Sequence, residues 1–375
     1  MLPYGRQSID DRDVAAVVEA LTSDWLTTGP AVDAFERDLA EHAGGVPMVS
    51  VTSGTAALHV AYAAAEVGRG DEVVTTPLTF VATAAGATLL GATVVFADVE
   101  EDTGNLDPAA AEAAVTARTK VITSVDYAGL PGDFDALRGV ADRAGALLME
   151  DAAHSIGGTW HGRPVGTLAD LTTFSFFPTK NLTTAEGGAV ASPDPELLER
   201  ARRFKNHGLV RDRALQRTPD EGPWHQEVHA FGLNYRLPDV LCALGSAQLH
   251  RLPEFVRRRA AISARYDAAL AGISGVRTPA RRADTEPAWH LYPLRVRDGR
   301  RRALFDHLRA AGIGVQVNYV PAYWHPVFED LGYKRGMCPN AEAYYAEEIS
   351  LPLFADLTDD QVDRVVDEIG KFFGE

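Results

Sequence analysis

Cysteine, basic residues and long apolar runs are all scarce in this chain of 375 residues. The only two cysteines, Cys242 and Cys338, are too few and too far apart to predict a disulfide framework or a CxxC site, which favours a reducing compartment. No stretch approaches the roughly 18 uninterrupted apolar residues of a membrane span, and the N-terminus lacks the basic start and apolar run of a signal peptide. We therefore expect a cytoplasmic protein with no membrane partner.

Basic residues are outnumbered by acidic ones: 36 Lys and Arg stand against 52 Asp and Glu, for a formal net charge of −16. A surface of this sign repels phosphate backbones, which argues against nucleic acid as a partner. In other respects the composition, with 46% hydrophobic and 23% charged residues, is that of an ordinary globular protein. We expect the chain to fold.

The common signatures of nucleotide cofactors and metal ions are also missing from the sequence. No GxxxxGK[ST] string occurs, and GIGVQV at 312–317 lacks the third glycine of a dinucleotide-binding motif. The string HQEVH at 225–229 places Glu227 one residue too late for a zinc-protease helix, and Pro223 and Gly232 argue against a long helix there. ATP, NAD and a metal site are therefore not predicted.

Short β-rich runs alternate with helical runs from residue 46 onward, starting with VPMVSV and GTAALHVAYAAAEV. This alternation is typical of βαβ units and predicts an α/β fold with a mainly parallel sheet covered by helices on both faces. Beyond Pro238 a long helical run extends toward Arg259, and a second, shorter alternation follows it. We expect two domains: a large one at 1–249, which includes the N-terminal segment, and a small C-terminal α/β domain at 250–375.

The first candidate site residues follow the predicted strand VPMVSV, at the end of a strand where sites in open parallel sheets form. Ser53, Gly54 and Thr55 lie where this strand turns into a helix. Their backbone amides and hydroxyls, with the positive end of the helix dipole, suit an anion such as phosphate. The alternative is that Ser53 only caps the helix, since serine and threonine are favoured at that position.

A second candidate is Asp151, which follows the apolar run of the predicted strand ALLMED and begins the motif DAAHS. An acidic residue after such a strand is costly unless a cationic group meets it, and the nitrogen of a pyridinium ring is such a group. The alternative is that Asp151 caps the following turn and that His154 packs locally.

The third candidate is Lys180 in TTFSFFPTKNLTTAEGG, a lysine that closely follows an aromatic strand. The period-two alternation of that strand places Ser175 on the same face as Thr173 and Phe177, and Pro178 ends the strand. Most lysines are solvated surface residues, but a partly desolvated lysine can lose its proton and bond covalently to an aldehyde. An anion site, an acid and an amine at one edge of a sheet together match the requirements of pyridoxal phosphate.

Ordered motifs along nearly the whole chain resemble those of the DegT/DnrJ/EryC1/StrS family of sugar aminotransferases. They are DWLTTGP, TSGTAAL, TPLTFVATA, SVDYAG, EDAAHSIG, FSFFPTKNLTTAEGGAV, KNHG, NYRLPDV, QVNYVPAY and EISLPLF. The resemblance implies the aspartate aminotransferase type of fold (fold type I), with a mainly parallel seven-stranded sheet. It also implies pyridoxal 5'-phosphate as the cofactor, with pyridoxamine 5'-phosphate as its intermediate form.

The resemblance also assigns roles to individual residues. It implies that Lys180 holds the cofactor covalently and moves a proton between cofactor and sugar, that Asp151 keeps the ring nitrogen protonated, and that His154 lies beside the ring. The other cofactor-binding residues that it implies are Ser53, Gly54, Thr55, Phe80, Ser175 and Asn234. Phe80 would stack on the ring, and Asn234 would reach the phosphate from a second subunit. A homodimer with shared active sites is therefore expected.

For the substrate, the resemblance implies contacts at the first tyrosine, at the WLTTG loop and in the QVNY stretch. These residues are Tyr4, Trp25, Leu26, Thr27, Gln316, Val317, Asn318 and Tyr319; Ser53 is expected to touch the substrate as well. The alternative is that Tyr4 and Trp25 are packing aromatics and that Tyr319 belongs to a buried strand.

One branch of this family dehydrates its substrate and has histidine in place of the lysine, so Lys180 excludes that branch. The motifs are most similar to those of transaminases that aminate C4 of a UDP-linked 4-keto-6-deoxy-N-acetylhexosamine, as in pseudaminic acid synthesis, although FFPTKN departs from that branch. The implied partners are a nucleotide-linked keto sugar and L-glutamate. Two alternatives stay open: transamination of another cyclic ketone, such as a C3-keto sugar, an inositol or an antibiotic precursor, and a regulator that binds the cofactor without turnover.

Overall fold

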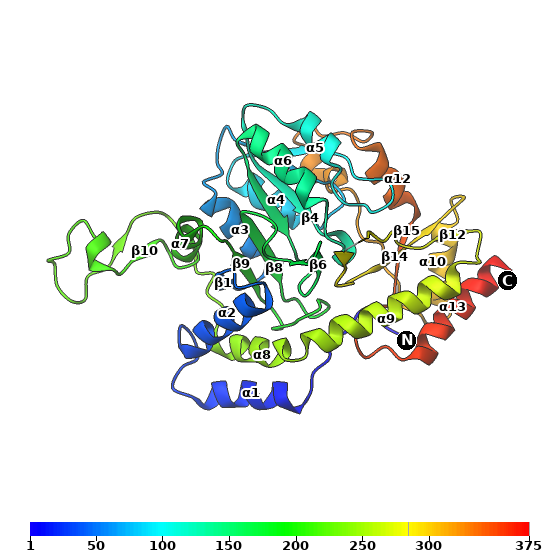
Figure 1. Ribbon diagram of the computed structural model, residues 1–375, viewed down its shortest axis with the longest axis horizontal. Helices are drawn as coiled ribbons and strands as arrows, with labels where there is room; N and C mark the ends of the chain where they lie inside the picture. The colour runs from blue at the N-terminus through cyan, green and yellow to red at the C-terminus, as the bar shows by residue number, and fades with distance from the viewer. Residues whose placement is uncertain (284, 375) are drawn as a thin grey trace.

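A computed structural model describes residues 1–283 and 285–374 and has a seven-stranded sheet at its centre (Figure 1). The order of the strands is β1-β9-β8-β5-β4-β2-β3. Their bounds are β1 (Met48–Val51), β2 (Glu72–Thr75), β3 (Thr93–Phe96), β4 (Thr119–Val125), β5 (Leu147–Asp151), β8 (Leu171–Ser175) and β9 (Gly188–Ala191). The strands run parallel, except that β9 is antiparallel to both of its neighbours. The predicted α/β fold with a mainly parallel seven-stranded sheet is confirmed.

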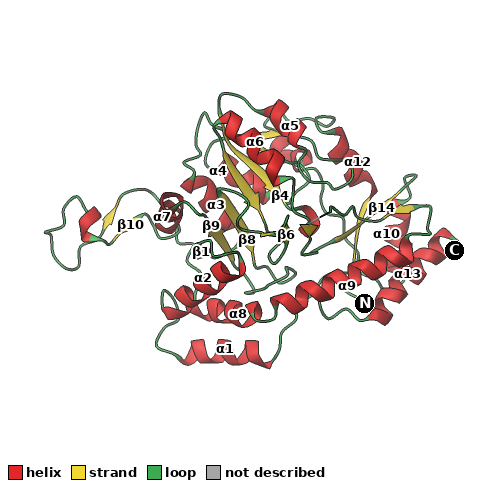
Figure 2. Ribbon diagram, in the orientation of Figure 1, coloured by secondary structure: helices red, strands yellow, loops and turns green. Residues whose placement is uncertain are grey.

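Both faces of this sheet are buried. Neighbouring residues of a strand point to opposite faces, and both sets of side chains lie in an apolar cluster. Val73 of β2 and Val121 of β4 belong to one apolar cluster, whereas Val74 and Ile122 belong to another. Figure 2 shows the helices around the sheet. The first cluster includes residues of α3 (Gly54–Ala64), α4 (Ala82–Leu89) and α7 (Pro195–Phe204), and the second includes residues of α2 (Pro30–His42), α5 (Pro108–Ala114) and α6 (Phe134–Ala144).

The long helical run predicted beyond Pro238 is in fact two helices, α8 (Asp239–Leu249) and α9 (Leu252–Leu270). The run is divided near Pro253, because a proline inside a helix would remove an internal hydrogen bond and clash with the preceding turn. Pro253 instead lies in the first turn of α9, where its missing N–H costs nothing. Helix α8 packs against α2 and α1 (Asp11–Thr22), and α9 continues toward the C-terminal part of the chain (Figure 1).

The C-terminal part of the chain forms a smaller antiparallel sheet in the order β12-β14-β15. The strands are β12 (Val276–Arg277), β14 (Tyr292–Val296) and β15 (Glu348–Leu351). The helices of this part are α10 (Arg301–Ala310), α11 (Pro326–Glu329), α12 (Pro339–Glu347) and α13 (Asp359–Phe373). A third small sheet joins β13 (Thr285–Glu286) to β6 (Thr159–Trp160) and β7 (Arg163–Pro164), so the two parts of the chain are interlocked. The division at residue 250 stays a prediction.

An arm formed by residues 206–235 leaves the body of the protein at the left of Figure 1. It contains β10 (Leu209–Val210) paired antiparallel with β11 (Glu227–Val228), and a bridge between Asn206 and Asn234 closes its base. The HQEVH string therefore lies in a strand region, where Glu227 pairs with the flanking histidines. Among the described residues, no helix has the length and apolar character needed to cross a membrane.

Candidate active site

A cavity of about 410 Å³ opens where β5 and β8 end and where β1 gives way to α3; we call it the lysine cavity. Many of the predicted site residues line it. They are Tyr4, Ser53, Gly54, Thr55, Phe80, Asp151, His154, Ser175, Lys180, Asn318 and Tyr319. The three strand ends that the sequence marks as candidate sites therefore meet in one space, as expected for the carboxyl edge of a parallel sheet.

One end of the lysine cavity is built to accept an anion. Ser53 caps α3, and its Oγ accepts the amide of Ala56 at 3.0 Å. The amides of Gly54 and Thr55 come before the first intrahelical bonds, so they remain to bind a ligand at the positive end of the helix. Ser175 faces them so closely that a Cβ at Gly54 would lie 2.7 Å from the Cβ of Ser175. Only glycine lets the start of α3 approach Ser175 this closely.

Asp151 is a buried and firmly held carboxylate in the same cavity, only 4% exposed. Thr83 donates a hydrogen bond to its Oδ2 at 2.7 Å, and the amide of Ala153 donates to its Oδ1 at 3.2 Å. Burial raises the pKa of Asp151, while these two hydrogen bonds and the charge of Lys180 counteract the rise. A cationic ring nitrogen would supply the counter-charge that such a carboxylate favours.

Lys180 lies in a tight turn after β8, in which its amide donates to the carbonyl of Phe177 at 2.9 Å. Burial lowers the pKa of its amine to about 8, with Asp151 opposing the decrease and Arg259 adding to it. An amine with a pKa near 8 is unprotonated in a much larger fraction of molecules than one at 10.5, the ordinary value for lysine. The environment thus prepares Lys180 to act as a nucleophile and as a base.

Aromatic and imidazole rings border the rest of the lysine cavity. The ring centroid of Phe80 lies 6.2 Å from that of Tyr319, and the side chain of Phe80 is 59% exposed although it lines the cavity. The Tyr319 hydroxyl and Nε2 of His154 are 3.2 Å apart and share a hydrogen bond, and His290 packs against His154 with centroids 4.4 Å apart. Burial and the charge of Lys180 hold the pKa of His154 well below its usual value, so this imidazole is neutral.

These features fit pyridoxal phosphate on the chemistry of the donors. The cradle between Gly54 and Ser175 suits the phosphate, Asp151 suits the ring nitrogen, Lys180 suits the aldehyde and the exposed ring of Phe80 suits the ring face. The chemistry of this cofactor requires a lysine of lowered pKa, a buried acid and free amides at a helix start, and all three meet in this cavity.

Other predicted residues lie elsewhere in a single chain. Gln316 is exposed, and Val317 does not line the lysine cavity among the described residues, whereas Asn318 and Tyr319 do. Asn234 is exposed at the base of the arm, outside the lysine cavity of its own chain. The loop between α1 and α2 carries exposed Trp25, Leu26 and Thr27, and Trp25 lines a different cavity.

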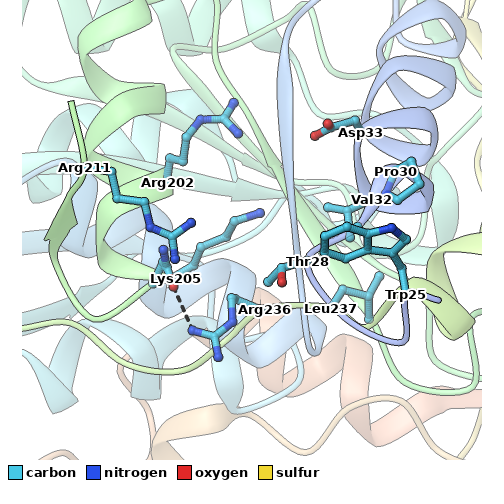
Figure 3. A pocket seen from close by; sticks show the side chains of 12 residues that line it. Trp25, Thr28, Pro30, Val32, Asp33, Arg202, Lys205, Arg211, Arg236 and Leu237 are labelled. Carbon is cyan, nitrogen blue, oxygen red and sulfur yellow. Dashed lines mark hydrogen bonds between the residues drawn. The ribbon is translucent and has the colours of Figure 1, made fainter. Parts of the chain in front are cut away.

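This different cavity, of about 610 Å³, lies at the base of the arm and is mainly basic; we call it the basic cavity. Figure 3 shows Arg202, Lys205, Arg211 and Arg236 on one side and Trp25, with Asp33, on the other. Lys205 is neutralised by Glu36 at 2.8 Å, and Arg202 lies 3.5 Å from the same carboxylate.

The two arginines at the base of the arm bond to uncharged groups instead. Arg236 donates to the amide oxygen of Asn206 at 2.7 Å, drawn as a dashed line in Figure 3, and Arg211 donates to the amide oxygen of Gln226 at 3.1 Å. The charges of Arg211 and Arg236 therefore remain available to an anion.

Thr83, His290 and Arg259 lie at or beside the lysine cavity, but the sequence reasoning missed them. Thr83 stands in the same TPLTFVATA motif as Phe80, three residues further along and thus on the same face of a helical turn, which is a usable signal. His290 belongs to the second alternation, more than a hundred residues after Lys180, and no spacing in the sequence connects the two.

Comparison with known proteins gives a consistent result. A model of the DegT/DnrJ/EryC1/StrS aminotransferase family matches residues 7–370. The spore coat polysaccharide biosynthesis protein SpsC of Bacillus subtilis is 40% identical over 374 residues, which cover 98% of this chain and 96% of that protein.

Solved structures agree along the full length of the chain. A sugar aminotransferase of Streptococcus pneumoniae described as putative, Spr1654 in its PMP form, has a TM-score of 0.94 at 32% identity and covers 100% of this chain and 99% of its own. PseC of Helicobacter pylori, an aminotransferase involved in pseudaminic acid biosynthesis, has a TM-score of 0.92 at 31% identity and covers 100% and 99%.

Proposed function

The chain belongs to the DegT/DnrJ/EryC1/StrS aminotransferase family, and from this premise we propose that it transfers an amino group from L-glutamate to C4 of a UDP-linked 4-keto-6-deoxyhexosamine. That it is a sugar aminotransferase dependent on pyridoxal phosphate follows from the family and its solved structures. The observation that carries the assignment is the meeting of the phosphate cradle at Gly54, the acid Asp151 and the amine of Lys180 in one cavity.

Bound pyridoxal phosphate supplies an electron sink that stabilises negative charge on the carbon next to the transferred nitrogen. The chain's own residues provide the remaining functions in the proposed reaction. Lys180, whose pKa is about 8, takes up a proton at Nζ and returns it. Asp151, fixed by Thr83 and Ala153, would hold a positive charge on the ring nitrogen, and the rings of Phe80 and Tyr319 border the same cavity.

The nucleotide part of this proposal is supported by the basic cavity. In a protein of net charge −16, Arg211 and Arg236 keep their charges available beside an exposed Trp25, a combination suited to a diphosphate and a stacking base. The choice of UDP and of C4 rests on the motifs SVDYAG, TTAEGGAV and QVNY. PseC, an aminotransferase involved in pseudaminic acid biosynthesis, is among the structural neighbours. The cytoplasmic location expected from the sequence is part of the same proposal.

If the nucleotide binds at the basic cavity, Arg236→Gln should raise KM for the nucleotide sugar about tenfold to a hundredfold, since a hydrogen bond to a charged group contributes about 1.5–3 kcal/mol. The release of 2-oxoglutarate from L-glutamate in the first half-reaction should stay unchanged. Arg302→Gln, on the exposed face of α10, is the matched control. An unchanged KM in Arg236→Gln would remove the basic cavity from the substrate site.

The homodimer with shared sites is likewise proposed, and the surface of one chain supports it. Asn234, expected to bind phosphate, is exposed at the base of the arm, and the arm also exposes Trp224 (77%) and Phe231 (98%). Apolar side chains exposed to this degree on a projecting segment favour burial against a second copy.

Mixing two defective proteins tests whether the sites are shared. A Lys180→Ala chain and an Asn234→Ala chain, unfolded and refolded together, would give mixed dimers with one complete and one doubly defective site. Activity on the order of a quarter of the wild-type value is expected, because about half of the dimers are mixed and each has one good site. No recovery beyond the sum of the two separate proteins would refute shared sites.

The catalytic assignment is tested with an absorption spectrum recorded before and after addition of L-glutamate, together with release of 2-oxoglutarate. The band of the lysine-bound cofactor should disappear as one equivalent of 2-oxoglutarate forms per site. Lys180→Ala should lose turnover without a change in the unfolding midpoint, whereas Lys334→Ala, an exposed lysine after α11, should behave like wild type. A protein that binds the cofactor yet releases no 2-oxoglutarate would be a regulator and not a transaminase.

A further inference from the structure

The guanidinium of Arg259 is buried against the loop that carries Lys180. Arg259 lies on α9 and is 2% exposed. It donates hydrogen bonds to the carbonyl oxygens of Leu353 at 2.9 Å, His290 at 3.4 Å and Thr179 at 3.4 Å. These acceptors belong to the segment after β15, the segment before β14 and the residue directly before the lysine. One side chain therefore ties the lysine loop to two segments of the C-terminal part.

The charge of this arginine has no carboxylate to balance it nearby. Its three acceptors are carbonyl oxygens, its Nε bonds to nothing within the described ranges, and no residue of 1–283 or 285–374 forms an ion pair with it. A buried cation without a counter-charge is expensive, and a neutral side chain of similar shape would avoid that cost. Burial lowers the pKa of Arg259 only to about 10, so it remains cationic near neutral pH.

We propose that Arg259 is a positioning residue for Lys180: it clamps the backbone of the lysine loop at Thr179 and keeps a permanent positive charge beside that loop. This positioning role serves the proposed transaminase function and rests on it. Among the described residues, Lys180 lines the lysine cavity and Arg259 does not, so Arg259 acts through Lys180 and not by touching the reactants.

The groups around the Lys180 amine determine which of its protonation states is favoured. Burial has the largest effect on the pKa of Lys180 and favours the neutral amine; Asp151 favours the protonated amine, and Arg259 favours the neutral one. Tyr4 and His290 are the other titratable groups next to Arg259; burial raises the pKa of the tyrosine and lowers that of the histidine, so both are uncharged near neutral pH. Arg259 therefore adds to the effect of burial and opposes that of Asp151.

The test measures the reactivity of Lys180 in the full-length protein freed of cofactor, so it needs neither the sugar nor turnover. Trace labelling with acetic anhydride at a series of pH values, read by mass spectrometry of the Lys180 peptide, gives the midpoint at which the amine becomes reactive. Arg259→Gln removes the charge but can still donate to the Leu353 carbonyl, and its midpoint should rise by about one pH unit. Arg259→Lys keeps the charge, and its midpoint should stay near that of wild type.

Arg257→Gln is the matched control, since Arg257 is exposed on the same helix two residues away and its labelling midpoint should not change. An Arg259→Gln midpoint equal to wild type overturns the proposal, and so does an Arg259→Lys midpoint that rises as far as that of the glutamine variant. If Arg259→Gln fails to fold, an Arg259→Lys midpoint about one pH unit above that of wild type overturns the proposal. Because labelling does not depend on transamination, a protein inactive toward every sugar can still pass this test, and an active one can still fail it.

Discussion

Replacing Gly54 with alanine is the sharpest test of the phosphate cradle. An added Cβ would lie 2.7 Å from the Cβ of Ser175 and 2.8 Å from its Oγ, closer than such atoms approach without movement. Ser175 ends β8, which pairs on both sides, so the strand cannot easily move and α3 must shift instead. Overpacking of this kind costs about 1–3 kcal/mol, more than the up to about 1 kcal/mol that alanine gains over glycine in a helix.

We therefore expect Gly54→Ala to lower the free energy of unfolding of the cofactor-free protein by about 1–2 kcal/mol, measured by urea unfolding. It should weaken cofactor affinity further, because the shift displaces the amides at the start of α3. The second substitution Ser175→Gly removes the atoms that clash and leaves the Cα of residue 175, at 3.4 Å, as the nearest neighbour.

In that background the stability cost of Gly54→Ala should disappear, which a double-mutant cycle measures as a coupling between the two sites. An equal cost with and without the Ser175 side chain would refute the steric argument, and so would a Gly54→Ala protein as stable as wild type with unchanged cofactor affinity.

Two further predictions concern buried acids. Thr83→Val removes the hydroxyl that donates to Asp151 at 2.7 Å, so it should raise the pKa of Asp151 and lower kcat/KM about tenfold to a hundredfold. Thr88→Val on the same helix, where the hydroxyl bonds only to the helix backbone, should have little effect. Equal activities of the two variants would contradict the role of Thr83. Burial raises the pKa of Glu348 from 4.5 to about 8, so the proton binds more tightly in the folded state and stability should fall as pH rises across that interval. Glu348→Gln should flatten this fall in urea unfolding series, and an unchanged slope would assign it to other groups.

The parts of the fold that follow from the sequence are those governed by local periodicity. Neighbouring apolar residues of a strand, such as Val73 and Val74, are buried on opposite faces of the sheet. Continuous apolar runs of this kind, alternating with helices, are typical of a parallel sheet, and the prediction of one is correct. The antiparallel direction of β9 is set by its tertiary position between β1 and β8, which no local pattern encodes. The arm was not predicted either, because β10 and β11 are strands of only two residues that pair with each other.

The site shows the same limit. Ser53, Asp151 and Lys180 each follow a strand, and the topology of a parallel sheet brings them together, so spacing and strand ends suffice to find them. Arg259 is one of three consecutive arginines, and composition cannot distinguish them. Its position on the helix could have distinguished it, because Arg259 lies on the same buried face of α9 as Phe255, Ile262 and Tyr266. A charged residue on such an apolar face needs a hydrogen-bonding partner or has a function.

The closed base of the arm makes this segment a module. Asn206 and Asn234 are bridged, so chain entry and exit lie side by side while everything between them projects outward. A segment with adjacent ends can be lengthened, shortened or exchanged with little effect on the closure of the chain around it. Arms of other lengths can therefore be grafted onto this body while the lysine cavity on the central sheet keeps its architecture.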